Sequence, residues 1–305
     1  MNNESRRRFL MQSIQLAAAT VASSSISRSA FADPLGGPIG IQLYTVNGPM
    51  QEDPAGTLAK LGKIGFRQVE SAGFGKLPAG QFRKLIDDAG LSCPSAHLSF
   101  QLDKLDATFD DAHALGASYA VSSMLDSLLP GEKTKNANGK RAMSLDEAKR
   151  TAEICNRLGE GAKRAGLQYA YHNHDLEFAD QGGGAVGYDV LLRETDPQLV
   201  KFEIDCGWMV FAGHDPVQYF RNYPNRFPLI HVKDFLAPAN QPAAGEKTAM
   251  QGAELGRGVV DYKPIFAAAK KAGLKHYFAE QEGPFARMSQ LQAAQVAYEY
   301  LHGID

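Results

Sequence analysis

Histidines and acids gather at four places in the second half of the chain, each at the end of a run of β-branched or aromatic residues. The four clusters are Tyr171-His172-Asn173-His174-Asp175, Glu203-Ile204-Asp205, His231-Val232-Lys233-Asp234 and Glu280-Gln281-Glu282. Burying such groups without partners is costly, so a shared cation or a hydrogen-bonded network must hold them together. Imidazole mixed with carboxylate suits Mn, Zn, Fe or Co better than calcium, which prefers oxygen alone. The clusters therefore predict one divalent metal ion.

Alternation of side chains along a strand puts members of each cluster on one face. These pairs are His172 with His174, Glu203 with Asp205, and His231 with Lys233. Any one of the histidines is explained equally well as a hydrogen-bonded rim residue, whereas the whole set favours a metal site. The pattern leaves open whether His172, His174 or both touch the metal.

The elements that carry these clusters repeat along the chain as short apolar runs separated by helical segments. We expect strands near residues 39–45, 66–70, 92–97, 118–123, 167–173, 199–205, 228–233 and 275–280. This alternation builds a parallel sheet with helices outside it, and eight such strands close into a barrel. The fold class is therefore predicted to be α/β, a single-domain (β/α)8 TIM barrel. The four clusters then meet on the C-terminal face, where barrel active sites lie.

Local signals mark where the helices begin and end. Asp53-Pro54 and Asp215-Pro216 each combine an N-cap acid with proline at the first helical position. Ser144 has the capping-box spacing to Glu147. The tripeptide Ala-Gly-Leu occurs three times where a helix should give way to a strand, and its glycines suit the left-handed position after a helix: Gly90, Gly166 and Gly273.

Two connections are long for this fold, residues 124–143 and 235–260. Both follow expected strands, so they lie on the active-site face. Both are candidate lids, although the first is explained equally well as a tolerated insertion.

Residues 1–32 are interpreted as an export signal. Arg6-Arg7 with Phe9-Leu10 matches the twin-arginine pattern, a mildly apolar stretch follows, and Ala30-Phe31-Ala32 gives a cleavage site. A membrane span would need roughly 18 or more apolar residues, and this stretch is too polar for one. We expect the mature barrel domain, residues 33–305, to lie in the periplasm, with no membrane anchor.

The composition of the remaining chain limits its partners. Without residues 1–32 it has 28 basic and 33 acidic residues, a formal charge of −5. No cluster of Lys and Arg is visible, which argues against nucleic acid as a partner. The three cysteines, Cys93, Cys155 and Cys206, lack metal-like spacing and predict no disulfide framework.

Taken with its motifs, the chain resembles the xylose-isomerase-like barrel proteins, often called sugar phosphate isomerase/epimerases. The resemblance runs from Ile39 to the last helix. Its marks are Ile39-Gly40-Ile41-Gln42-Leu43-Tyr44, Gly65-Phe66-Arg67-Gln68-Val69-Glu70, Ser95-Ala96-His97, His172-Asn173-His174-Asp175, Asp205, Ile230-His231-Val232-Lys233-Asp234, Gly256-Arg257-Gly258 and Glu280-Gln281.

The resemblance implies a metal held by Glu, Asp, His and Glu from successive late strands. Asp205, His231 and Glu280 match the last three, and His172 stands where the first Glu is usual. That departure puts the symmetric two-glutamate epimerase mechanism in doubt. Trp208 stands where related ketose epimerases have a substrate-contacting histidine, and it is explained equally well as a core aromatic.

The same resemblance suggests roles for further residues. The preferred base is His174, with Glu282 and Glu177 as weaker candidates. Lys233 would steady anionic charge, or else form a rim ion pair with Asp234 or Glu203. Glu280 is assigned to catalysis as well as to the metal. The expected substrate-binding residues are Glu70, His97, Trp208, Arg257 and Glu282.

The chemistry implied is removal of a proton next to a carbonyl, giving an enediolate. We therefore expect a sugar isomerase or epimerase acting on a small keto-sugar, with one divalent ion (Mn, Zn, Co or Fe) as cofactor. A lyase or dehydratase acting on a keto-glycoside or keto-inositol is the first alternative, and a non-catalytic sugar-binding barrel the second. An endonuclease IV-like phosphodiesterase would need more rim histidines and a basic groove. A homo-oligomer is left open.

Overall fold

A computed structural model describes residues 36–129, 133–135, 140–236, 252–283, 285 and 287–304. The expected export signal, residues 1–32, and residues 237–251 of the second long connection lie outside the described residues. Of the first long connection, the structure describes a 3-10 turn, η2 (Asp126–Leu128), and a bridge between Lys135 and Arg141.

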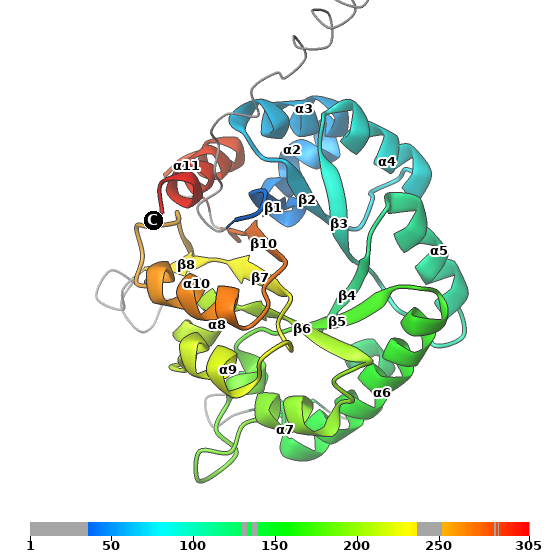
Figure 1. The fold of residues 1–305 in the computed structure, drawn as a ribbon, viewed down its shortest axis with the longest axis vertical. Helices are drawn as coiled ribbons and strands as arrows, with labels where there is room; N and C mark the ends of the chain where they lie inside the picture. The colour runs from blue at the N-terminus through cyan, green and yellow to red at the C-terminus, as the bar shows by residue number, and fades with distance from the viewer. Residues whose placement is uncertain are drawn as a thin grey trace, which may run out of the picture. The chain divides into compact units, whose positions relative to one another are not determined.

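Eight parallel strands close into a barrel, which confirms the predicted fold (Figure 1). In order around the barrel they are β1 (Gly40–Gln42), β10 (His276–Ala279), β7 (Leu229–Val232), β6 (Val200–Asp205), β5 (Gln168–His172), β4 (Tyr119–Ser123), β3 (Ser92–His97) and β2 (Gln68–Ala72). Each overlaps one of the eight runs expected from the sequence. A small antiparallel pair, β8 (Asp234–Phe235) and β9 (Gly252–Ala253), stands beyond the end of β7.

Helices surround the barrel between successive strands (Figure 1). They are α2 (Asn47–Glu52), α3 (Pro54–Ile64), α4 (Ala79–Asp88), α5 (Leu105–Leu115), α6 (Leu145–Arg164), α7 (Gly187–Glu194), α8 (Cys206–Phe211), α9 (Pro216–Asn222), α10 (Tyr262–Lys271) and α11 (Gln290–Gly303), with 3-10 turns η1 (Leu43–Val46) and η3 (Leu176–Phe178). Asp53, Ser144 and Asp215 cap their helices as predicted. Gly90, Gly166 and Gly273 all have positive φ, which confirms the helix-ending signals.

The apolar core has two layers. The larger one packs the helices against the outside of the sheet. The smaller one fills the barrel itself with Val121, Ala170, Leu229 and Phe278, one from each of four strands. Gly40 of β1 is required here, because a Cβ on it would lie 2.5 Å from the Phe278 ring. The polar groups at the carboxyl ends of the strands pack against this apolar layer.

Strand register sets which polar side chains become neighbours. His172 of β5 is paired with Glu203 of β6, and Asp205 of β6 with His231 of β7. The parallel sheet thus brings together groups that are far apart in the sequence, at the carboxyl ends of the strands.

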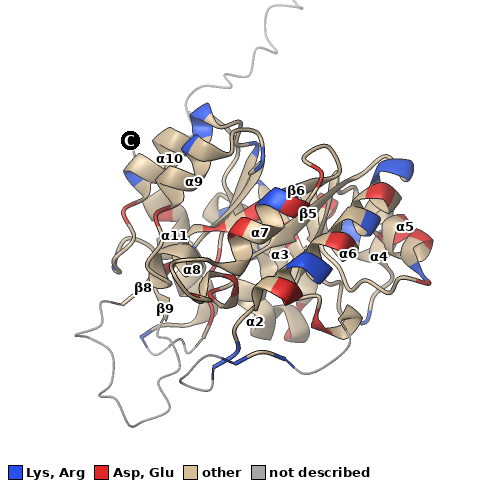
Figure 2. Cartoon of the chain, turned by 90° about the horizontal axis from the view of Figure 1, so that it is seen from below, with Lys and Arg blue, Asp and Glu red and all other residues tan. Residues whose placement is uncertain are grey.

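The surface offers no strong separation of charge over the outer helices α4, α5 and α6, where acidic and basic residues are interspersed (Figure 2). Among the described residues, no helix is long and apolar enough to cross a membrane. Cys93, Cys155 and Cys206 are buried and unpaired, as predicted.

Candidate metal centre and active site

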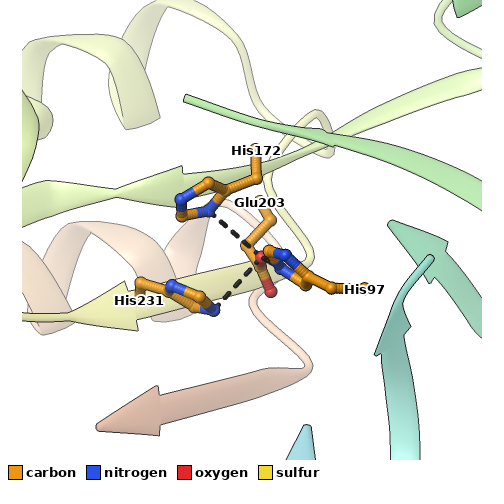
Figure 3. Close-up of side chains that lie close together, drawn as sticks. All are labelled: His97, His172, Glu203 and His231. Carbon is orange, nitrogen blue, oxygen red and sulfur yellow. Dashed lines mark hydrogen bonds and ion pairs between the residues drawn. The ribbon is translucent and has the colours of Figure 1, made fainter. Parts of the chain in front are cut away.

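Glu203 lies among three imidazoles that come from three other strands (Figure 3). Its Oε2 is 2.7 Å from Nε2 of His97, 3.2 Å from Nδ1 of His172 and 3.2 Å from Nε2 of His231. Glu203, His172 and His231 are buried. Three ring nitrogens and one carboxylate oxygen therefore converge on a common point.

A second carboxylate, Glu70 of β2, closes this group on its other side. Its Oε2 is 2.5 Å from Nε2 of His231 and 3.3 Å from Nε2 of His97. The side chain of Gln42 donates to the same oxygen at 2.8 Å, and the hydroxyl of Ser95 donates to the other. Glu70 and His97, expected from the sequence to bind substrate, are thus part of the cluster itself.

Lys233 forms the centre of an adjoining group of acids. Its Nζ is 2.6 Å from Glu282, 2.7 Å from Oε2 of Glu280 and 3.1 Å from Oδ2 of Asp205. It also lies 4.9 Å from the centre of the Trp208 ring. The ammonium group is buried, so it offsets the charge of two buried acids, Asp205 and Glu280, and of the partly exposed Glu282.

The alternative partners predicted for Lys233 are wrong. Glu203 faces the imidazoles instead. The Asp234 carboxylate accepts backbone N–H groups and so holds the chain that returns to the barrel; the donors are Phe235, Gly256, Gly258 and Val260. The sequence could not predict these partners of Asp234, because they are backbone N–H groups, and three of the four lie more than twenty residues further along the chain.

Two overlapping groups of side chains have the spacing of metal ligands. The first is His97, His172, Glu203 and His231; the second is His172, Asp205, His231 and Glu280, the set expected from the sequence. Within each group the potential ligand atoms all lie within 4.8 Å of one another. His174 belongs to neither, and its ring centre is 5.0 Å from that of His172.

Electrostatics explain how the acids are held without a metal. Burial by itself lowers the pKa of His97, but the charges of Glu70 and Glu203 outweigh it and raise the pKa to about 10. His231 behaves in the same way, with Glu280 as a further acid that raises its pKa. Two imidazolium groups thus offset the buried carboxylates, and a divalent cation could take over that function.

The two histidines of β5 and its following loop, His172 and His174, are neutral and available as electron-pair donors. Burial, followed by the charge of His231, holds the pKa of His172 well below its usual range. Burial and the charge of Lys233 lower the pKa of His174 to about 4. Nδ1 of His172, Nδ1 of His174 and Oε1 of Glu203 are buried without a hydrogen-bond partner among the described residues. Unpartnered nitrogen and oxygen donors beside acids fit a transition metal.

Glu177, a buried acid three residues after His174, fixes the segment that bears His174. Its carboxylate accepts the Tyr171 hydroxyl at 2.7 Å and the backbone N–H of His174 at 2.9 Å. It has no contact that would make it the base that the sequence suggested as a weaker candidate. The position of Glu177 in the sequence, a few residues after the β5 cluster, did not predict these hydrogen bonds.

Two expected substrate-binding residues lie at the margin of the cluster. Trp208 is buried, with its ring centre 5.0 Å from that of Phe235 and 5.7 Å from that of His174, and its indole N–H has no partner among the described residues. Arg257 is half exposed, and its guanidinium is 3.9 Å from Glu254. The structure thus brings Trp208 to the wall of the site and leaves Arg257 outside its hydrogen-bonded network.

A cavity of about 640 Å³ opens beside the cluster, at the ends of β2, β3 and β4. His97 borders it, together with Phe74, Ser99 and Ser123. This volume is within the range of small-molecule sites, roughly 300–1,000 Å³. Its hydroxyl-bearing wall suits a polyhydroxylated ligand.

Sequence reasoning missed the residues that orient the cluster. Gln42 and Ser95 hold Glu70. Glu203 was predicted to share a face with Asp205 or to pair with Lys233, but not to bind the histidines. A usable signal existed for Glu203, because an acid two residues before Asp205 on the same strand must point into the same barrel.

A closed parallel barrel with imidazoles and carboxylates at its mouth defines a TIM-barrel protein with a candidate metal centre. Residues 58–295 match the family model described as xylose isomerase-like TIM barrel. The chain belongs to this family, which confirms the resemblance found in the sequence.

The similar proteins are named for two kinds of reaction, dehydration and isomerisation or epimerisation. An inosose dehydratase from Lacticaseibacillus casei is 29% identical over 204 residues, 63% of this chain and 66% of that enzyme, just under two thirds of its length. A sugar phosphate isomerase/epimerase structure from Parabacteroides distasonis is 28% identical, with a TM-score of 0.69, and the match covers 92% of this chain and 97% of that one. The IOLI protein with bound zinc has a TM-score of 0.64, covers 87% of this chain and 96% of that one, and at 13% identity shows the fold alone.

Proposed function

We propose that this chain is a divalent-metal-dependent enzyme that removes the proton next to the carbonyl of a keto-inositol or keto-sugar and then expels a β-oxygen. The observation that carries the proposal is the convergence of His97, His172, Glu203 and His231 beside a cavity with hydroxyl-bearing walls. Periplasmic location of the mature chain stays part of the proposal, as do a small carbohydrate substrate and an open choice between monomer and homo-oligomer.

The metal-binding side chains would be drawn from the two overlapping groups, which share His172 and His231. A divalent ion held there supplies a Lewis acid for a carbonyl and its neighbouring hydroxyl. Lys233, fixed by three carboxylates, adds a positive charge next to the Trp208 ring. Fixed positive charge at this wall stabilises an enediolate as its negative charge develops.

His174 is the proposed base. It is neutral, its Nδ1 has no hydrogen-bond partner among the described residues, and Glu177 fixes its backbone. It takes the α-proton, and the electron pair of the C–H bond moves into the enediolate. When that enediolate collapses to an α,β-unsaturated ketone, the bond to the β-oxygen breaks with its electron pair on oxygen. The oxygen takes the proton that His174 gained and leaves as water or as an alcohol, which returns His174 to its neutral form.

Elimination is favoured over epimerisation by the residue types at the mouth. Epimerisation in this family relies on a pair of glutamates, and His172 stands at the position of one of them. The name of the dehydratase relative supports the same reaction. Isomerisation or epimerisation is the second candidate, and the 28% identity to a sugar phosphate isomerase/epimerase structure favours it.

The product mass separates these reactions. Purified chain, stripped of metal and reloaded with Mn, Co or Zn, would be incubated with an inosose, a 3-keto-glycoside and a ketose. We expect loss of one water from the inosose, or of the alcohol from the glycoside, only with metal present. A product of unchanged mass would support isomerisation, and tight binding without turnover in every metal form would support a sugar-binding barrel.

A further inference from the structure

The two candidate metal groups differ in which cation already occupies them. In the group that contains Asp205 and Glu280, the ammonium of Lys233 is bonded to both carboxylates, at 3.1 Å and 2.7 Å. A divalent ion bound to the same two oxygens would lie against this ammonium and be repelled by it. The Lys233 side chain is buried, and its backbone N–H and C=O are both bonded to the hydroxyl of Tyr262, so its strand end is fixed.

In the group around Glu203 the positive charge sits instead on the rings of His97 and His231, and an ion can displace a ring proton, whereas it cannot displace the proton-saturated ammonium of Lys233 without moving the side chain. The three ring nitrogens lie 2.7, 3.2 and 3.2 Å from one carboxylate oxygen. Two atoms bonded to one ion at about 2.1 Å, at octahedral or tetrahedral angles, are roughly 3.0–3.4 Å apart. The spacing around Glu203 is close to that of neighbouring ligands of a single ion.

Two buried atoms of this group make no hydrogen bond among the described residues: Oε1 of Glu203, and Nδ1 of His172, which both groups share and which is 3.2 Å from Oε2 of Glu203. Both side chains are more than nine-tenths buried. In the other group Oδ2 of Asp205 also makes no hydrogen bond, but it is ion-paired with Lys233 at 3.1 Å. Such atoms are costly to leave unsatisfied, and an ion at this point would satisfy both.

The hydrogen-bond partners of the two ring nitrogens of His231 favour an ion at the same position, beside Glu203. Its Nε2 faces Glu70 and Glu203, and its Nδ1 is 3.0 Å from Glu280. An ion on Nε2 leaves the Nδ1–H free to donate to Glu280, which is the usual way a carboxylate orients a metal-binding histidine. Glu280 is then a positioning residue.

We propose that the divalent ion is held by His97, His172, Glu203 and His231, and that Lys233 replaces the ion between Asp205 and Glu280. This inference rests on the metal dependence of the proposed function. It moves the ion away from the set expected from the sequence and toward His97, which borders the cavity. An open coordination position there would face the substrate.

A matched pair of variants on β6 tests the position. Glu203→Gln and Asp205→Asn each remove one buried carboxylate. The asparagine keeps an oxygen that can accept the backbone N–H of Trp208, which donates to Oδ1 of Asp205 at 2.9 Å in the native chain. Metal affinity of the full chain would be measured by titration with Zn and Mn, alongside melting curves. We expect at least a hundredfold loss for Glu203→Gln and less than tenfold for Asp205→Asn.

The opposite order, with Asp205→Asn the weaker binder, would overturn the proposal. If both variants lose affinity equally, the anomalous scattering peak of a Zn- or Mn-loaded crystal decides. A peak between His97 and Glu203 supports the assignment, and a peak between Asp205 and Glu280 refutes it. A wild-type chain that binds no metal would refute the metal dependence itself, whereas a chain that binds metal at His97 but lacks turnover would refute only the proposed reaction.

Discussion

Single residues in this barrel act through charges that water does not reach. Lys233 and His231 each face several acids at hydrogen-bond distance, and both are buried. The resemblance to the xylose-isomerase-like barrels predicted that His172, Asp205, His231 and Glu280 would meet, and their ligand atoms lie within 4.8 Å of one another. It could not foresee which acid pairs with which base, because that depends on side-chain directions within the closed barrel.

Replacing Lys233 tests how much the buried charge matters. Lys233→Met keeps the length of the side chain but leaves three carboxylates without their cation, so we expect it to lower the free energy of unfolding by about 3–5 kcal/mol. Lys84→Met is the matched control, because its ion pair with Asp88 is on the surface and is worth about 0–1 kcal/mol. Denaturant unfolding at neutral pH measures both, and equal losses would contradict the buried-pair interpretation.

Glu177 gives a pH-dependent prediction. Burial raises its pKa from 4.5 to about 7, so the folded chain holds this proton more tightly than the unfolded chain. The resulting stability is complete below about pH 4.5 and is lost as the pH rises to about 7.

Glu177→Gln should remove this pH-dependent loss of stability, because glutamine carries no charge at any pH. Relative to the native chain, the variant should gain about 3 kcal/mol of unfolding free energy between pH 4.5 and pH 8. Its amide can still accept the N–H of His174 and donate to the Tyr171 hydroxyl. Denaturant melts across this range measure the difference, and a difference that does not change with pH would contradict the raised pKa.

At the scale of elements, the sequence predicted every barrel strand because apolar runs and helix caps repeat with one period. Asp53, Ser144 and Asp215 cap as expected, and three glycines end helices with positive φ. The antiparallel pair β8 and β9 was not foreseen, since two-residue strands leave no periodic signal. Its anchor, Asp234, is visible only once the backbone N–H groups of the returning chain are in place.

Gly40 marks where β1 must pass closely over the barrel interior. Gly40→Ala would place its Cβ 2.5 Å from the Phe278 ring and 2.8 Å from the carbonyl oxygen of Tyr277. We expect a loss of about 1–3 kcal/mol from this overpacking. Gly80→Ala is the matched control, since nothing lies within 4 Å of a Cβ there, and alanine within a helix should be neutral or stabilising by about 0.5–1 kcal/mol. A neutral Gly40→Ala would contradict the close packing of β1.

At the scale of the whole molecule, helices surround a closed barrel and bury two layers of apolar core. Its three cysteines are free, so packing has the stabilising part that disulfides have in smaller domains. Sequence reasoning reached the family and the face of the site, while the choice between two overlapping metal positions needed the geometry.

Metal binding should appear as added stability. At a free concentration a hundred times the dissociation constant, an ion that binds only the folded chain stabilises it by about 2.7 kcal/mol. The gain should grow with pH, because protons compete for the imidazoles. Thermal melts with Zn or Mn, and again after a chelator, measure it. His231→Gln is the control that should lose the response, and a melting temperature unaffected by metal in the native chain would contradict the candidate centre.

The central claim is that this barrel removes a proton next to a carbonyl with the help of a metal. Proton exchange tests it most directly: an inosose and a 3-keto-glycoside would be incubated in D2O with metal-loaded chain, metal-free chain and the His231→Gln variant, and the α-C–H signal followed by NMR. We expect that signal to disappear, through exchange or through product formation, only with the metal-loaded native chain. Persistence of the signal at full metal occupancy, or equally fast loss without metal, would contradict the claim.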